Sequence, residues 1–159
     1  MKLFCFASKN VENIQIGIDR QLWAVGTLLN QQSMAGRITK AEKYLRPGDL
    51  GVLYCNPTHS FTTPFIVRSH ADPNEVVLDV WPEPWCLPFK IETLGDLSRQ
   101  ISGDLAAKHW PVLKRRLEAN HGRGGVSAAM NITGTTVFVP VEITGEDWEA
   151  ILEDLAKPK

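Results

Sequence analysis

The sequence predicts a single α+β domain, with a curved mixed β-sheet or a small β-barrel flanked by helices. At least four strand-like stretches are interrupted irregularly by helical patterns, without the regular strand–helix alternation that builds a parallel sheet. The chain has 159 residues, 43% of them hydrophobic, which is enough to bury one sizeable core. No repeat or linker interrupts it, so we expect residues 1–159 to form one domain.

The chain is expected to begin with a strand, a helix and a connection. Leu3–Phe6 is an apolar run typical of a buried strand, and Ser8 or Asn10 then offers a side-chain cap for a helix. The apolar face of this helix comprises Val11, Ile14 and Ile18. Trp23 follows in the connection. A second helix is predicted over residues 40–45, because Thr39 and Glu42 match a capping box, and Arg-Pro-Gly-Asp at 46–49 ends it.

Strands dominate the middle of the chain and helices its end. The predicted strands are Leu50–Cys55, Phe61–Arg68, Val76–Trp81 and Val137–Ile143. Pro64 and Pro140 favour an edge or a bulge in two of them. The predicted helices are one around Leu94, Leu97 and Ile101 capped by Thr93 and Asp96, one from Pro111 to Ala119, and one behind Thr144 that carries Trp148, Ile151, Leu152 and Leu155.

Charge and cysteine content limit the possible functions. The formal net charge is −1, so any binding of nucleic acid must come from a local patch. Cys5, Cys55 and Cys86 are odd in number and lack CxxC spacing, which predicts buried free thiols in a reducing cytoplasm. No apolar run approaches the roughly 20 residues that span a bilayer, so we expect a soluble, cytoplasmic protein without a membrane partner.

Catalytic and metal-binding patterns are sparse. The four histidines are scattered without paired metal-ligand spacing, and no GxSxG or HExxH motif occurs. We therefore expect no metal, no cofactor and no catalytic residue.

Three tryptophans predict an aromatic pocket for a planar ligand such as an unstacked nucleobase. Trp81 and Trp85 bracket a segment with two prolines, and Trp23 lies far upstream. Four residues of extended strand span about 13 Å, whereas two rings around one base lie roughly 7 Å apart. Trp81 and Trp85 can therefore clasp one base only if the prolines turn the chain. The simpler arrangement places Trp23 opposite Trp81, with Trp85 in the core or at the rim. The alternative is that all three are core residues.

Polar and basic residues are candidates for the remaining contacts. The amide and hydroxyl groups that can match a base edge are those of Ser8, Asn13, Asn30 and Asn56, although Ser8 can instead be a cap and Asn56-Pro57 a turn. The predicted phosphate contacts are Lys9, Lys114, Arg115, Arg116 and Arg123, the last in the glycine-rich segment 121–125. A second basic cluster comprises Arg37, Lys40, Lys43 and Arg46. Either cluster can instead be a solvated face.

These residues carry a resemblance to two related families of the PUA-like superfamily. Residues 3–14, LFCFASKNVENI, followed by Leu22-Trp23-Ala24, resemble the opening of YTH domains, in which the tryptophan forms one wall of a cage for methylated adenine. Residues 44–54, YLRPGDLGVLY, are similar to the helix, xPGD and strand signature of EVE domains, and residues 144–148, TGEDW, resemble their closing helix. The similarity extends over nearly the whole chain.

The resemblance implies roles for individual residues. It makes Trp23 a cage wall, Ser8 and Asn13 contacts to the base edge, and the backbone of Ala24 a partner for an exocyclic amine. The sequence departs from the YTH pattern at Ala7 and Lys9. The EVE Arg-Asn pair is also incomplete, since residues 29–32 are Leu-Asn-Gln-Gln. The ligand is therefore expected to differ from the best-known ligands of both families.

The favoured interpretation is a reader that holds a modified, methylated base of DNA or RNA in an aromatic cage. The alternative is a small hydrolase of modified nucleosides, similar to the ASCH group of the same superfamily, with Lys40, Thr39 and Glu42 as its catalytic set. A third interpretation is an interaction module that works with a separate nuclease or restriction component, which is compatible with the first.

Overall fold

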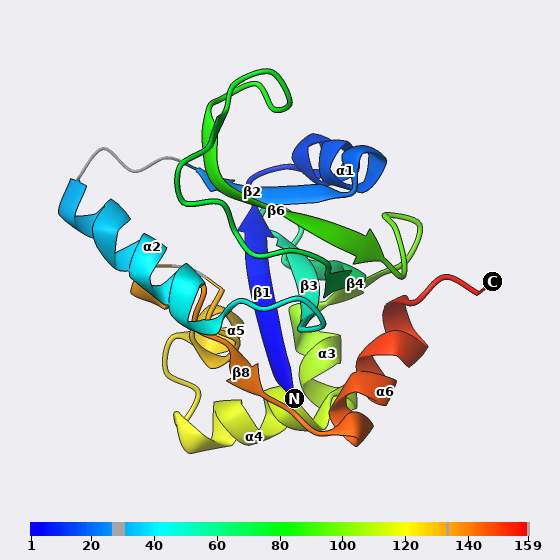
Figure 1. Cartoon of the computed structure of the whole chain (residues 1–159). Coiled ribbons are helices and arrows are strands. Elements are labelled where there is room, and N and C mark those ends of the chain that lie inside the picture. Colours follow the sequence, from blue (N-terminus) through cyan, green and yellow to red (C-terminus); the bar gives the residue numbers. More distant parts are fainter. Residues whose placement is uncertain (27–30, 133, 159) are drawn as a thin grey trace.

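The computed structural model describes residues 1–26, 31–132 and 134–158. One mixed sheet runs through it in the order β2-β6-β4-β3-β1-β8, with β5 paired to β6 and β7 paired to β4 (Figure 1). The strands are β1 (Lys2–Ser8), β2 (Leu22–Gly26), β3 (Leu50–Cys55), β4 (Ser60–Val67), β5 (Val76–Val77), β6 (Trp85–Thr93), β7 (Gln100–Ser102) and β8 (Val141–Glu142). Strands β1 and β3 are parallel, and the other pairs among the described residues are antiparallel.

Helices lie on both sides of this curled sheet. They are α1 (Val11–Arg20), α2 (Gln31–Tyr44), α3 (Gly103–His109), α4 (Pro111–Ala119), α5 (Gly125–Ala129) and α6 (Gly145–Leu155). A short 3₁₀ turn, η1, spans Gly134–Thr136. The architecture is the predicted α+β fold with a curved mixed sheet. No helix in the described part of the chain is long and apolar enough to cross a membrane.

Two hydrophobic cores lie on opposite faces of β1, because successive side chains of a strand point to opposite faces. Phe4 and Phe6 join a core formed with α1, α2, β2 and β6. Leu3 and Cys5 join a second core formed with α3, α4, α5 and α6. In Figure 1, α1, β2 and β6 lie toward the carboxyl end of β1, and α4 lies toward its amino end. The three cysteines are buried free thiols, as predicted.

Several elements agree with the sequence analysis, above all the helices that begin with a capping residue. Asn10 caps α1 by accepting the backbone N–H of Asn13 at 2.8 Å. Thr144 and Asp147 form a reciprocal capping box at α6. Pro64 lies in a bulge of β4, because Leu53 pairs with Thr62 while Gly51 pairs with Phe65. The strand Leu50–Cys55 and the helix Pro111–Ala119 have the predicted bounds.

Several predicted elements are wrong. Trp23 lies in strand β2, not in a connection. The helix expected to begin at residue 40 begins at Gln31, and Thr39 is inside it, donating to the carbonyl oxygen of Ala35 at 2.9 Å. No helix spans Leu94–Ile101. Asp96 there accepts the backbone N–H of Ser98 at 2.8 Å in a turn, and strand β7 follows.

Strand extents also differ. The predicted strand Val76–Trp81 is a strand only at Val76–Val77, and Val137–Ile143 only at Val141–Glu142. The nine-residue strand β6 and the helices α3 and α5 were not predicted.

Candidate functional site

The three tryptophans gather in one cluster. The rings of Trp81 and Trp85 stack with their centroids 4.2 Å apart and their planes 13° apart. Trp23 meets both rings edge-on, at 5.3 Å and 74° from Trp85 and at 6.0 Å and 79° from Trp81. The cluster therefore consists of a parallel pair and one perpendicular ring.

The prolines do turn the chain between Trp81 and Trp85. Trp85 pairs with Val77 and with Gly26 as the first residue of β6, while Trp81 precedes the turn and donates its Nε1–H to the carbonyl oxygen of Asn13 at 3.0 Å. A base between two rings requires about 7 Å, two van der Waals separations, so the 4.2 Å gap between Trp81 and Trp85 admits none. Trp23 and Trp81 are nearly perpendicular, so they do not form the predicted pair of facing walls.

A cavity of about 230 Å³ lies beside the cluster. It is lined by Phe6, Ala7, Trp23, Ala24, Val25, Gly26, Arg37, Trp85, Ile132, Gly134 and Val137. Trp23 and Trp85 border it, and Trp81 does not, so Trp85 takes the place predicted for Trp81. Trp81 covers one face of Trp85 and Trp23 packs against it at 74°, and since Trp23 is only 1% and Trp85 only 8% exposed, a small part of each ring borders the cavity. The volume is below the roughly 300–1,000 Å³ of pockets for drug-sized ligands and suits one small planar group.

Of the predicted polar contacts that the structure describes, only Ala24 borders this cavity. The hydroxyl of Ser8 donates to the carbonyl oxygen of Asn10 at 2.6 Å, and the N–H of Asn56 donates to the carbonyl oxygen of Ser8 at 2.9 Å. Asn13 is buried in α1 below Trp81. These residues thus shape the turn after β1 and hold the tryptophan cluster. Asn30 lies outside the described residues.

Several predicted phosphate contacts are engaged within the protein. Lys9 forms an ion pair with Glu83, and the Arg116 Nε–H donates to the carbonyl oxygen of Ala129. Arg115 donates to both carboxylate oxygens of Asp147, at 3.0 and 2.8 Å. Lys114 and Arg123 are exposed. Figure 1 places α4 at the opposite end of β1 from β2, and none of these basic residues is among the described residues that line the cavity.

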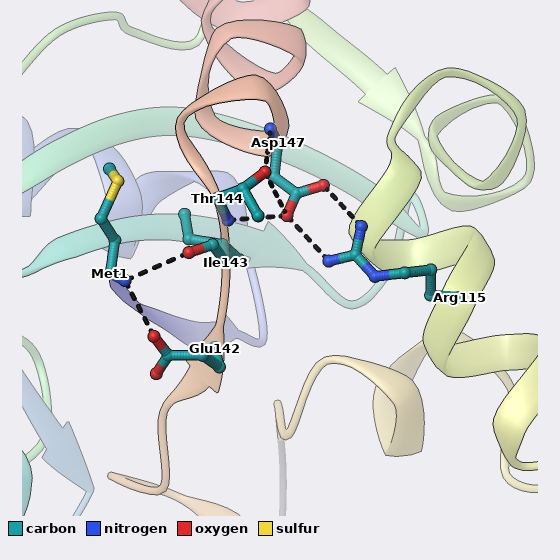
Figure 2. A network of polar contacts seen from close by, with 6 residues as sticks. All are labelled: Met1, Arg115, Glu142, Ile143, Thr144 and Asp147. Carbon is teal, nitrogen blue, oxygen red and sulfur yellow. Dashed lines mark hydrogen bonds and ion pairs between the residues drawn. The ribbon is translucent and has the colours of Figure 1, made fainter.

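The Arg115 contact belongs to a network that fastens α6 to α4 (Figure 2). Asp147 is fully buried and also accepts the backbone N–H and the hydroxyl of Thr144, at 2.9 and 3.2 Å. Burial alone would raise the pKa of Asp147, but the hydrogen bonds from Arg115 and Thr144 outweigh it and hold that pKa below its ordinary value. The terminal amino group of Met1 donates to Glu142 and to the carbonyl oxygen of Ile143 in the same region.

Arg37 is the functional candidate that the sequence analysis did not single out for the pocket. Arg37 lines the cavity, and its Nη1–H donates to the carbonyl oxygen of Gly26 at 3.1 Å. The sequence placed it only in a basic cluster along a helix. Phe6, Val25 and Ile132 were likewise not predicted as lining residues. They are ordinary apolar positions in the sequence, and only the fold brings them together.

The residues proposed for a hydrolase are not assembled into a site. Thr39 is bonded within α2, Lys40 donates to the carbonyl oxygen of Thr135, and neither they nor Glu42 line the cavity. Among the described residues, no group of three or more histidine, cysteine, aspartate or glutamate side chains is placed to hold a metal ion.

The overall structure of the chain is similar to that of known proteins of one fold. No protein-family model and no curated protein matches the sequence. The YTH domain of the Zygosaccharomyces rouxii MRB1 protein, solved in complex with N6-methyladenosine RNA, aligns with 96% of this chain and 84% of its own length, with a TM-score of 0.57 and 14% identity. The MmI1 YTH domain aligns with 94% of this chain and 92% of its own length, with a TM-score of 0.55 and 13% identity. The chain therefore has a YTH-like fold.

Proposed function

We propose that this chain is a nucleic-acid-binding reader that takes one modified base, extruded from a single strand, into the cavity beside Trp23 and Trp85. One observation carries the proposal: in a YTH-like fold, two tryptophans border a cavity of single-base size. The solved YTH domain of Zygosaccharomyces rouxii, which was crystallised with N6-methyladenosine RNA, supports a modified nucleic acid as the ligand class.

The two tryptophans have different roles in this proposal. Their rings are 74° apart, so a base that stacks on one of them meets the other edge-on. Stacking on aromatic side chains contributes about 1–3 kcal/mol per base and offsets the cost of extrusion. Trp81 supports Trp85 from behind, which holds the ring in place before the base arrives.

A methyl group on the base is recognised by shape. It fills apolar space against the tryptophans and Val25, and an unmethylated base leaves a small void there. One buried methyl group contributes about 0.8 kcal/mol, so discrimination by this contact alone is modest. The backbone of Ala24, in the cavity wall, serves a polar group of the base. Lys9, which directly follows β1 and exchanges its exposed ion pair with Glu83 for a phosphate, and the exposed Lys114 and Arg123 serve phosphates.

The test is a Trp85→Leu variant, which keeps apolar volume and removes the ring. Affinity for labelled single-stranded RNA and DNA, each with and without one methylated base, is measured by fluorescence anisotropy. We expect roughly 5- to 150-fold weaker binding of the modified oligonucleotide, the equivalent of losing one stacking contact. Trp148→Leu, on α6 and outside the cavity, is the matched control. Wild-type binding without preference for any modified base, or unchanged preference in a folded Trp85→Leu protein, would contradict the proposal.

A further inference from the structure

Among the described residues that line the cavity, one side chain is charged, and the others are aromatic, aliphatic or glycine residues. We propose that this residue, Arg37, determines which base the site accepts, by donating hydrogen bonds to a base that presents two neighbouring acceptors. The accepted ligand is then a modified guanine or cytosine, not a modified adenine. The inference rests on the proposed function and names its ligand class.

The position of Arg37 is fixed from the β2 side. Its Nη1–H donates at 3.1 Å to the carbonyl oxygen of Gly26, the last residue of the strand that carries Trp23. Within the described parts of the chain, this is the only hydrogen bond of the Arg37 side chain. A guanidinium carries five N–H donors in one plane, so several donors remain for a ligand. The hydrogen bond to Gly26 thus orients the guanidinium and leaves its other N–H groups available to a ligand.

The charge of Arg37 has no anionic partner among the described residues of the cavity. No aspartate or glutamate belongs to the described lining. The thiol of Cys86 is its ionisable neighbour, but burial raises the pKa of that thiol, so it stays neutral at pH 7. Burial also lowers the pKa of Arg37, because a partly desolvated cation is disfavoured, yet an arginine remains protonated. A half-buried cation without a counter-ion favours an electron-rich ligand group.

The donor geometry selects among base edges. Guanine presents O6 and N7 side by side as two acceptors, and arginine pairs with both in one plane. Cytosine presents O2 beside an unprotonated N3, which is the same acceptor pattern. Adenine sets the N6 amino donor beside N7, so one arginine donor would face another donor. The guanidinium can therefore donate two hydrogen bonds to guanine or cytosine, but on adenine one of its donors would face another donor.

The other side chains proposed as contacts to the base edge do not line the cavity, whereas Arg37 does. Ser8 and Asn13, which the resemblance made contacts to the base edge, lie outside the lining, with the Ser8 hydroxyl bonded to the turn. Besides Arg37, the described polar lining is backbone and the indole N–H groups. Among the described lining residues, Arg37 is thus the side chain that offers several coplanar N–H donors to a base edge.

The experiment compares Arg37→Gln with the wild-type protein on single-stranded oligonucleotides that differ only at one central base. The probes carry N6-methyladenine, 5-methylcytosine, O6-unsubstituted N1-methylguanine or the unmodified bases, in both RNA and DNA. For the wild-type protein we expect at least one methylated guanine or cytosine probe to bind roughly 5- to 150-fold more tightly than the N6-methyladenine probe, the range of one bidentate arginine contact. In Arg37→Gln this preference should fall to within about twofold.

Lys43→Gln is the matched control, because it removes one positive charge from the same helix at an exposed position outside the cavity. It should keep the wild-type preference. Three results would overturn the inference: preference of the wild-type protein for N6-methyladenine, unchanged preference in Arg37→Gln, or equal weakening of all probes in that variant, which would mean a phosphate contact. If no probe binds, the proposed function fails as well. If binding depends on Trp85 but not on Arg37, only this inference fails.

Discussion

At the scale of single residues, the position of Trp23 depends on a glycine. Gly17 lies on the buried face of α1, directly against the Trp23 ring. A Cβ atom there would lie 2.8 Å from Cε3 of Trp23 and 3.1 Å from the carbonyl oxygen of Leu22. Both distances are shorter than ordinary van der Waals contact. The missing side chain therefore allows the indole to settle between α1 and the cavity.

Gly17→Ala is expected to destabilise the protein and to weaken base binding. Alanine favours a helix by about 1 kcal/mol over glycine, but overpacking of a tight site costs about 1–3 kcal/mol, so the net change is a loss. Gly36→Ala is the control, since among the described residues no side chain and no backbone outside its own helix turn lies within 4 Å of its added Cβ in α2. That change should stabilise by about 0.5–1 kcal/mol. Urea unfolding of both variants measures the difference. Equal effects would show that Gly17 does not set the Trp23 position.

Residue chemistry allowed part of the site to be predicted. Trp23 and Trp85, which border the cavity, were proposed as base-binding residues because a large π-face is a conspicuous recognition group in a sequence. The choice between Trp81 and Trp85 failed, because the extended-strand distance does not apply once Pro82 and Pro84 turn the chain. Arg37 was indistinguishable from other helical cations, since its proximity to Gly26 arises only when α2 packs beside β2.

At the scale of elements, α6 is held by one buried carboxylate. Asp147 completes the capping box with Thr144. Its carboxylate also accepts hydrogen bonds from Nη1 and Nη2 of Arg115 on α4, as Figure 2 shows. The pKa of Asp147 lies below that of an exposed aspartate, because these hydrogen bonds favour the charged form despite its burial. The native state therefore binds a proton at this site less readily than the unfolded chain does.

The stability that Asp147 contributes should disappear in acid. A folded-state pKa below the unfolded value of about 3.9 means that the contribution is complete above roughly pH 5 and is lost as the pH falls through the folded pKa. We expect Asp147→Asn to destabilise by about 1–3 kcal/mol at pH 7 and to flatten the decline of melting temperature between about pH 5 and 2. Glu149→Gln, exposed on the same helix, should retain the wild-type profile. A decline as steep in Asp147→Asn as in the wild type would exclude this role.

Elements with local signals were predictable, and elements set by distant contacts were not. The caps and apolar spacing identified α1 and α6, and β3 was a plain apolar run. The segment Leu94–Ile101 has helix-like leucine spacing, but the hydroxyl oxygen of Thr62 lies 3.0 Å from the carbonyl oxygens of both Asp96 and Arg99, which share its one donated hydrogen, and this contact holds the segment as a turn. Strand β6 contains Pro88 and a left-handed Leu87, so its pairing with β2 and β4 is visible only in the folded protein.

At the scale of the whole molecule, charge and cavity are separated. The net charge is −1, and the cations predicted for phosphate lie mainly on α4, away from the carboxyl end of β1 where the cavity's Phe6 and Ala7 lie (Figure 1). Arg115 and Arg116 are engaged with Asp147 and Ala129. A short strand over the cavity therefore meets few cations, and only a longer one can also reach Lys114 and Arg123.

Salt should therefore act differently on short and long ligands. Single-stranded nucleic acid loses affinity with a slope in log K against log[salt] of about −0.7 per phosphate contact. We expect a slope near −1 for an oligonucleotide that covers only the cavity and a steeper slope for one long enough to reach α4. The double variant Lys114→Gln/Arg123→Gln should remove this difference, and Lys43→Gln should not. The ratio of affinities for modified and unmodified base should stay constant with salt, because stacking releases no counterions. Equal slopes for both lengths in the wild-type protein would instead confine the interface to the cavity, and the basic face of α4 would then be a solvated surface.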